Sequence, residues 1–232
     1  MFFNYSVIYK CLLLLKHHRR KKMSKDIEVE ISGPLTKEKN AELMEFFDKN
    51  GKKTNVKHRV LIDYSTFLGD GLKNRKKDIR LRITNGNPEI IVKLGDWNSA
   101  NHRKELSVFT EAGSFDRLVQ IYAALGYEKG MLCERTTHVY EYDGIEFALV
   151  EVPGHSFHYE AEIMSDEGSV EKARTHMEEV CKKLGLEVFT DQGYIEYIET
   201  LNKEVNEVFD FKDYTEDYFE NRYHFNQEKA AN

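Results

Sequence analysis

Cysteine, proline and tryptophan are scarce in this chain of 232 residues, which contains three, three and one of them respectively. Cys11, Cys133 and Cys181 are far apart and lack the close spacing of zinc ligands. The sequence therefore indicates neither a structural zinc site nor a disulfide framework. A reducing, cytoplasmic setting is expected.

The chain also lacks an uninterrupted hydrophobic run. Residues 2–15 are mostly apolar but include Asn4 and Lys10, and a basic cluster follows at 16–22. A transmembrane helix needs roughly 20 apolar residues, and a signal peptide carries its positive charge before the apolar run. We therefore expect residues 1–22 to be an extension that is disordered or not part of a native protein starting at Met23, in preference to a weak membrane anchor.

The chain also lacks an excess of positive charge. The net charge is −6, which is not typical of a protein that coats nucleic acid. With 41% hydrophobic residues the chain can bury one sizeable core, which we assign to residues 23–205. Residues 206–232 are acidic and aromatic without clear period, and a loosely packed or disordered tail is predicted there. No nucleic-acid or membrane partner is expected, and a homodimer is left open.

Charged residues instead alternate with apolar ones in several short segments. The pairs are Glu28 and Glu30, Arg80 and Arg82, Arg103 and Glu105, and Glu160 and Glu162. Because successive side chains of a strand point to opposite faces, both members of a pair share one face of a sheet. The opposite face is apolar and can be covered by helices.

Such alternation is also typical of any half-exposed antiparallel strand with ion pairs facing water. The distribution of sign favours another interpretation, because acid pairs and arginine pairs occur on separate strands. Carboxylate pairs suit Mg²⁺ or Mn²⁺, and Arg or Lys suits phosphate oxygens. The pattern predicts an anionic ligand bridged by a metal.

The wider pattern predicts an α+β fold. Strand-like runs occur at about 27–32, 55–65, 78–85, 88–95, 102–109, 130–141, 144–152 and 156–164, and helical periodicity at 36–49, 114–125, 170–184 and 192–208. We expect a closed eight-stranded antiparallel β-barrel, a tunnel, with the helices packed on its outside. Its lumen would be lined by Glu28, Glu30, Arg80, Arg82, Lys93, Arg103, Glu105, Arg135, Glu160 and Glu162.

The order of these motifs resembles the CYTH domain of the triphosphate tunnel metalloenzymes. The resemblance covers about residues 26–200 and rests on Glu28-Val29-Glu30, Ile62-Asp63-Tyr64, Arg80-Leu81-Arg82, Lys93, Arg103-Lys104-Glu105, Arg135 and Glu160-Ala161-Glu162. It implies metal ligation by Glu28, Glu30, Glu105, Glu160 and Glu162, and phosphate binding by Arg80, Arg82, Lys93, Arg103 and Arg135. Glu28, Glu30 and Lys93 would form the catalytic group.

Three positions depart from the family pattern. Ser32 stands where the family usually has a lysine, Ser107 where a second acid is common, and Cys133 where a basic residue is common. Lysines of the segment 69–77, namely Lys73, Lys76 or Lys77, are candidate substitutes. His155 and His158 are interpreted as solvated hairpin residues, and Trp97 as a side chain packed at the barrel rim.

The family includes several activities. Our leading hypothesis is an Mg²⁺- or Mn²⁺-dependent phosphohydrolase that releases phosphate from a small-molecule triphosphate, such as tripolyphosphate or a nucleoside or thiamine triphosphate. The alternatives are a class IV adenylyl cyclase, which makes cyclic AMP and pyrophosphate from ATP, and a non-catalytic polyphosphate- or nucleotide-binding module. Residue spacing does not separate these three.

Overall fold

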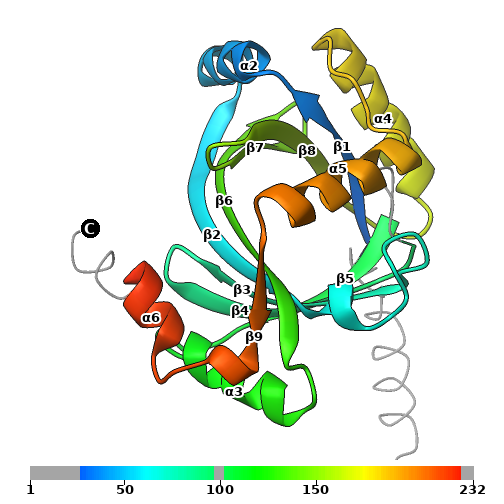
Figure 1. Ribbon diagram of the computed structural model, residues 1–232. Coiled ribbons are helices and arrows are strands. Elements are labelled where there is room, and N and C mark those ends of the chain that lie inside the picture. The colour runs from blue at the N-terminus through cyan, green and yellow to red at the C-terminus, as the bar shows by residue number, and fades with distance from the viewer. Residues whose placement is uncertain (1–26, 97–101, 226–232) are drawn as a thin grey trace, which may run out of the picture.

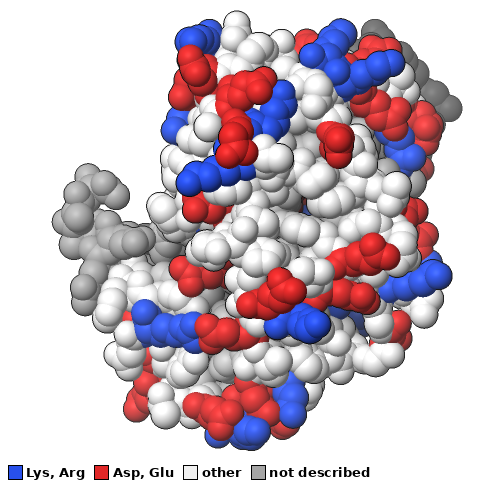
Figure 2. Space-filling view, turned by 45° about the horizontal axis from the view of Figure 1, so that its top comes forward, with Lys and Arg blue, Asp and Glu red and all other residues white. Residues whose placement is uncertain are grey.

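The computed structural model describes residues 27–96 and 102–225 (Figure 1). The predicted extension at 1–22 and the predicted placement of Trp97 lie outside these residues. Within the described ranges, no helix is both long and apolar enough to cross a membrane. On the face that Figure 2 shows, acidic and basic side chains are interspersed, and neither sign gathers into one large patch.

A single antiparallel sheet of nine strands forms the centre of the fold. The strands are β1 (Ile27–Leu35), β2 (Lys52–Asp63), β3 (Lys77–Thr84), β4 (Asn87–Leu94), β5 (His102–Phe109), β6 (Lys129–Tyr142), β7 (Ile145–Val152), β8 (Ser156–Ser165) and β9 (Glu207–Asp210). Their order is β2-β3-β4-β5-β1-β8-β7-β6-β9, and β2 pairs with β6 as well. The sheet therefore curls into a ring (Figure 1).

The eight predicted strands are present and close the ring through the pairing of β2 with β6, and β9 is a ninth strand that was not predicted. β6 is 14 residues long, and its first residues, Lys129–Leu132, pair with β9. Two hairpins of the ring turn on residue pairs with positive φ, Asn85-Gly86 and Asp143-Gly144. Asn or Asp followed by Gly tolerates this backbone, which matches the right-handed twist of the flanking strands.

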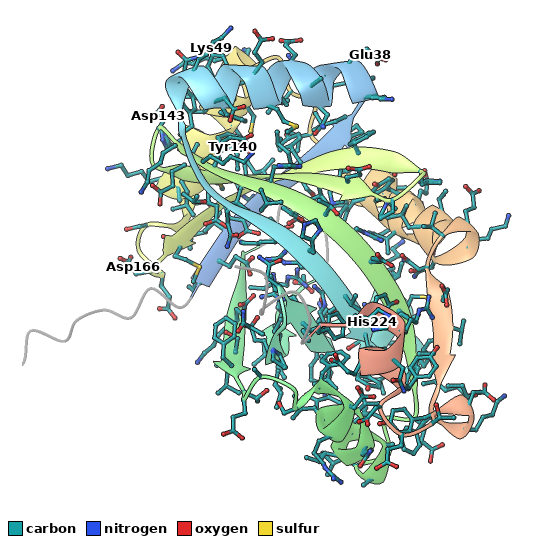
Figure 3. The ribbon with its side chains drawn as sticks, turned by 90° about the vertical axis from the view of Figure 1, so that its left-hand side faces the viewer. Glu38, Lys49, Tyr140, Asp143, Asp166 and His224 are labelled. Atoms are coloured by element: carbon teal, nitrogen blue, oxygen red, sulfur yellow. The ribbon has the colours of Figure 1, made fainter. Side chains whose placement is uncertain are left out.

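Helices α2 (Lys37–Asn50) and α4 (Val170–Lys183) cover one part of the outer face. Thr36 caps α2, its side chain accepting a hydrogen bond from the Lys39 backbone N–H, as expected of a Thr at a helix start. Tyr140 of β6 lies beneath α2 (Figure 3), with its ring stacked 5.4 Å from that of Phe47. Each fully buried side chain of this size contributes about 1.5–3 kcal/mol to folding.

Helix α3 (Phe115–Ala124) covers another part of the outer face, over β3, and the C-terminal segment packs beside it. This segment contains β9, the 3₁₀ turn η2 (Phe211–Asp213) and α6 (Tyr218–Tyr223), so the predicted loose tail is ordered as far as residue 225. Phe219 is fully buried, and Asp116 accepts hydrogen bonds from the backbone N–H groups of Phe219 and Glu220. The elements are too short to produce a sequence period, which is why composition alone indicated a tail.

Helix α5 (Asp191–Glu204) differs from the others, because it lies across one opening of the ring (Figure 1) and not on the outside. Ile198 and Leu201 of this helix line the central cavity. The prediction that all four helices cover the outer face is therefore wrong for α5. Its amphipathic pattern arises because one side closes the ring while the other meets water.

Candidate active site

A cavity of about 300 Å³ lies inside the ring. The strand alternation that places apolar side chains under the outer helices turns the charged ones inward. All ten residues predicted for the lumen line this cavity, namely Glu28, Glu30, Arg80, Arg82, Lys93, Arg103, Glu105, Arg135, Glu160 and Glu162. The structure thus brings the predicted set together in one place.

Three carboxylates of the set are close neighbours. Glu28 and Glu30 come from β1 and Glu162 from β8, and one oxygen of each lies within 4.8 Å of the others. Burial and the neighbouring carboxylates Glu160 and Glu28 raise the pKa of Glu30 to about 7, and the pKa of Glu162 rises well above its usual range for similar reasons. Hard oxygen donors that repel one another in this way suit Mg²⁺ or Mn²⁺.

The other two predicted metal ligands stand apart from this group. Glu105 lies 3.3 Å from the Lys93 ammonium. Glu160 lies 3.6 Å from His158 Nε2, and although burial opposes its ionisation, the hydrogen bond and charge of His158 hold its pKa at about 2. These two carboxylates have basic partners of their own within the cavity wall, Lys93 and His158.

Lys93 lies among the carboxylates and not among the arginines. Its ammonium is 2.7 Å from Glu28 Oε2, 3.3 Å from Glu105 and 3.9 Å from Glu30. Burial opposes the ionised state of Lys93, but Glu28 and Glu30 outweigh it and raise its pKa. Lys93 is therefore a charged residue that holds the acidic side of the cavity together.

A buried carboxylate that the sequence did not single out organises the arginines. The Asp78 side chain is fully buried, and its Oδ2 accepts hydrogen bonds from Arg103 at 2.6 Å and Arg80 at 2.7 Å, while Oδ1 accepts one from Arg75 at 3.2 Å. Burial alone would raise the pKa of Asp78, but Arg80 and then Arg103 hold it at about 2. The sequence feature that could have identified Asp78 is its position two residues before Arg80, which places both side chains on the same face of β3.

Arg82 and Arg135 have separate partners. Glu89 of β4, also unforeseen, accepts from Arg82 at 2.7 Å. Arg135 donates to the backbone carbonyl of Glu134 at 2.6 Å and to Asn206 Oδ1 at 2.9 Å. Each of these guanidiniums is thus held in one orientation along the cavity wall.

The substitutes considered for the missing lysine do not line the cavity. Lys73 and Lys77 are exposed, and Lys76 pairs with Asp96. Arg75 from the same segment does turn inward, where it contacts Asp63 at 2.7 Å as well as Asp78. Ser32 is fully buried, and among the described residues its hydroxyl has no hydrogen-bond partner.

The predicted departure at position 133 does lie in the cavity. Cys133 is a wall residue, and burial raises the pKa of its thiol to about 11, so the thiol is neutral at ordinary pH. The wall therefore carries no charge where the family pattern has a basic residue.

His158 is not the solvated hairpin residue that the sequence suggested. It is 7% exposed, and its Nδ1 lies 3.2 Å from the hydroxyl of Tyr197 on α5. His155 contacts Glu204 on the same helix at 3.2 Å, through a partly exposed pair. These contacts fasten α5 to the β7–β8 hairpin above the cavity.

Comparisons with known proteins agree with this architecture. No family model and no curated protein sequence matches the chain. Among solved structures it is similar to a conserved hypothetical protein from Pyrococcus furiosus, with 21% identity and a TM-score of 0.58 over 73% of this chain and 98% of that one.

Two similar structures carry a functional description. One is a candidate adenylate cyclase from Vibrio parahaemolyticus, with 15% identity and a TM-score of 0.55 over 69% of this chain and 90% of that one. The other is a candidate adenylyl cyclase from Hippeastrum described as having a dominant triphosphatase activity, with 14% identity and a TM-score of 0.51 over 71% of this chain and 90% of that one. The chain thus shares its fold with these proteins, as the resemblance to the CYTH domain predicted.

Proposed function

We propose that this protein is a divalent-metal-dependent phosphohydrolase that binds a triphosphate in the cavity and releases orthophosphate. The observation that carries the proposal is the pairing, within one cavity, of a close carboxylate group with a wall of fixed guanidiniums. The group consists of Glu28, Glu30 and Glu162. The guanidiniums belong to Arg80, Arg82, Arg103 and Arg135.

The donor set fits a hard cation. The three carboxylates supply oxygen ligands and no sulfur or imidazole lies in the group, so Mg²⁺ or Mn²⁺ is favoured over zinc. When bound, such an ion neutralises phosphate charge and supplies Lewis acidity at the phosphorus that reacts. Glu28, Glu30 and Glu162 would hold it, with Glu105 and Glu160 as further ligands if Lys93 and His158 move away from them.

The chain's own residues then have distinct parts in hydrolysis. Arg80 and Arg103, fixed through Asp78, bind non-bridging oxygens and stabilise the charge that develops on them. Helix α5 limits the access of bulk water. With tripolyphosphate, a water molecule attacks the terminal phosphorus and the bridging P–O bond breaks. The proton that the water loses passes to the pyrophosphate leaving group, so that orthophosphate and pyrophosphate are the two products.

The size of the cavity favours a compact substrate. A volume of about 300 Å³ lies at the lower end of the range of roughly 300–1,000 Å³ for small-molecule sites. Tripolyphosphate consists only of phosphoryl groups, whereas ATP would also need room for a base and a ribose. We therefore favour tripolyphosphate over a nucleotide. In the cyclase alternative, the ribose hydroxyl would attack the α-phosphate.

Product analysis tests the proposal. The full chain is incubated with tripolyphosphate, ATP or thiamine triphosphate, with Mg²⁺, Mn²⁺ or EDTA, and the products are separated by anion-exchange chromatography. Metal-dependent release of orthophosphate is expected, fastest from tripolyphosphate. Cyclic AMP with pyrophosphate would establish the cyclase instead, and binding without any turnover would refute both enzymes.

Matched variants show whether the cavity is responsible. Arg103→Gln should reduce turnover of tripolyphosphate by about 100-fold or more, because it removes a fixed cation from the developing charge. Arg117→Gln removes the same kind of charge from the exposed face of α3 and should leave turnover unchanged. Equal activity of both variants would place the reaction elsewhere.

A further inference from the structure

Arg59 of β2 is a basic cavity residue that neither the sequence pattern nor the proposed catalytic group includes. It lines the cavity, and its Nε is buried. Within the described ranges the side chain of Arg59 makes neither a hydrogen bond nor an ion pair, and its Nε is without a partner. Burying a charge costs free energy unless a partner compensates for it.

The other basic residues of the wall all have partners. Arg80 and Arg103 contact Asp78, Arg82 contacts Glu89, and Lys93 contacts Glu28. Lys57, two residues before Arg59 on the same face of β2, lies 3.3 Å from Glu146. Arg135, which is paired with Arg59 in the register of β2 and β6, bonds to Asn206. The Nε of Arg80 is also buried without a partner, but its guanidinium is bound to Asp78 through another nitrogen. Among the described basic residues of the wall, a side chain with no polar partner at all is therefore specific to Arg59.

The strand order places Arg59 across the ring from the carboxylate group. Counting round the ring from β2, β1 is the fourth strand in either direction, through β3-β4-β5 or through β6-β7-β8. Glu28 and Glu30 lie on β1 and Arg59 on β2, so a ligand that reaches both must cross the cavity. An anion with several phosphoryl groups along a chain is suited to contact both walls, with a different group at each.

The electrostatic surroundings of Arg59 agree with this position. Burial and then the like charge of Arg82 lower its pKa, while Glu160, Glu162 and Glu89 act in the opposite sense. Glu89 is paired with Arg82, and among the described residues no carboxylate forms an ion pair with Arg59. The Arg59 guanidinium is thus left to bind a phosphoryl group.

We propose that Arg59 is a further substrate-binding residue, which binds the phosphoryl group of a triphosphate that lies farthest from the metal. This inference rests on the proposed function. It adds chain length as a criterion for the substrate: Arg59 contributes to the binding of tripolyphosphate and not to that of orthophosphate.

Isothermal titration calorimetry in EDTA tests the role without any contribution from a metal. Tripolyphosphate and orthophosphate are titrated separately into the full chain, Arg59→Gln, Arg59→Lys and the surface control Arg117→Gln. Loss of one charge-assisted hydrogen bond should raise the Kd for tripolyphosphate by about 10- to 100-fold in Arg59→Gln. Arg59→Lys should retain part of the affinity, and the Kd for orthophosphate should stay within about twofold.

Thermal unfolding without ligand separates binding from structure. Because the buried Arg59 guanidinium has no polar partner among the described residues, Arg59→Gln should keep or raise the Tm. A lower Tm together with unchanged tripolyphosphate affinity would make Arg59 a structural residue and overturn the inference. Failure of the unaltered protein to bind tripolyphosphate would overturn the proposed function itself, whereas binding that Arg59→Gln leaves intact would overturn the role of Arg59 alone.

Discussion

Replacing Asp78 with Asn removes the single buried carboxylate that three guanidiniums share. The substitution keeps the shape of the side chain but takes away its charge. In the unaltered protein, Arg80, Arg103 and Arg75 lie 2.6–3.2 Å from Asp78. In the variant the three guanidiniums would remain close together without this negative charge. Removing one partner of a buried ion pair typically costs about 3–5 kcal/mol, because the remaining charge is buried without compensation.

The expected loss is large relative to the stability of a domain, which is typically about 5–15 kcal/mol. We expect the urea midpoint to fall by an amount corresponding to about 3–5 kcal/mol, with little change in the m-value. Thermal unfolding should show a decrease in Tm of roughly 6–20 °C for a chain of this size. Asp70→Asn, in an exposed loop position, is the matched control and should unfold like the unaltered protein.

The effect should also depend on pH in a defined direction. The pKa of Asp78 falls from 3.8 to about 2 on folding, so its ionised form stabilises the folded state. This contribution is fully present above pH 3.8 and is lost as the pH falls through about 2. The difference in unfolding free energy between Asp78→Asn and the unaltered protein should therefore shrink below pH 4. A difference below about 0.5 kcal/mol at pH 7 would refute the reasoning, because it would mean that the guanidiniums find other partners.

Two further predictions concern the metal group and the C-terminal segment. Glu162→Gln should weaken Mn²⁺ binding by at least about tenfold in calorimetry, since it removes one of three oxygen donors, whereas the exposed Glu167→Gln should not; equal affinities would exclude Glu162 as a ligand. Phe219→Ala should lower the unfolding free energy in urea by about 3–5 kcal/mol, since it empties a fully buried site, and a loss under 1 kcal/mol would show that the segment after β9 contributes little to the core.

The inward-facing residues could be predicted because side chains alternate between the two faces of a strand, so the position of a residue in the alternation determines its face. Glu28, Glu30, Arg80 and Arg82 follow this rule within segments whose other face is clearly apolar. Arg59 does not show it, because the first half of β2 is polar on both faces and largely exposed. Only the structure shows that Arg59 faces inward, on the same face of β2 as Leu61 and Asp63, which also line the cavity.

Partners could not be predicted, because they depend on register and on chain segments outside the strands. Asp78 lies on the same face of β3 as Arg80, so its inward direction could be predicted. Its contact with Arg103 could not, because it joins β3 to β5 across the intervening strand β4. Arg75 reaches the same carboxylate from a segment that the sequence indicates only as a lysine-rich loop. The added strand β9 was missed for a related reason, since it is short and its pairing depends on the first residues of β6.

The pairing inside the ring identifies what the cavity leaves for a ligand. Buried acids satisfy most of the cations, Asp78 three of them, and Lys93 in turn satisfies Glu28. Three groups are less completely compensated: the carboxyl groups of Glu30, whose contact with Lys93 is 3.9 Å long, and Glu162, both with raised pKa, and the guanidinium of Arg59 on the opposite side of the ring. A metal ion alone would compensate the carboxylates, and a phosphate alone would compensate Arg59. A metal-bound polyphosphate would do both, so the metal and the polyphosphate should each bind more tightly in the presence of the other.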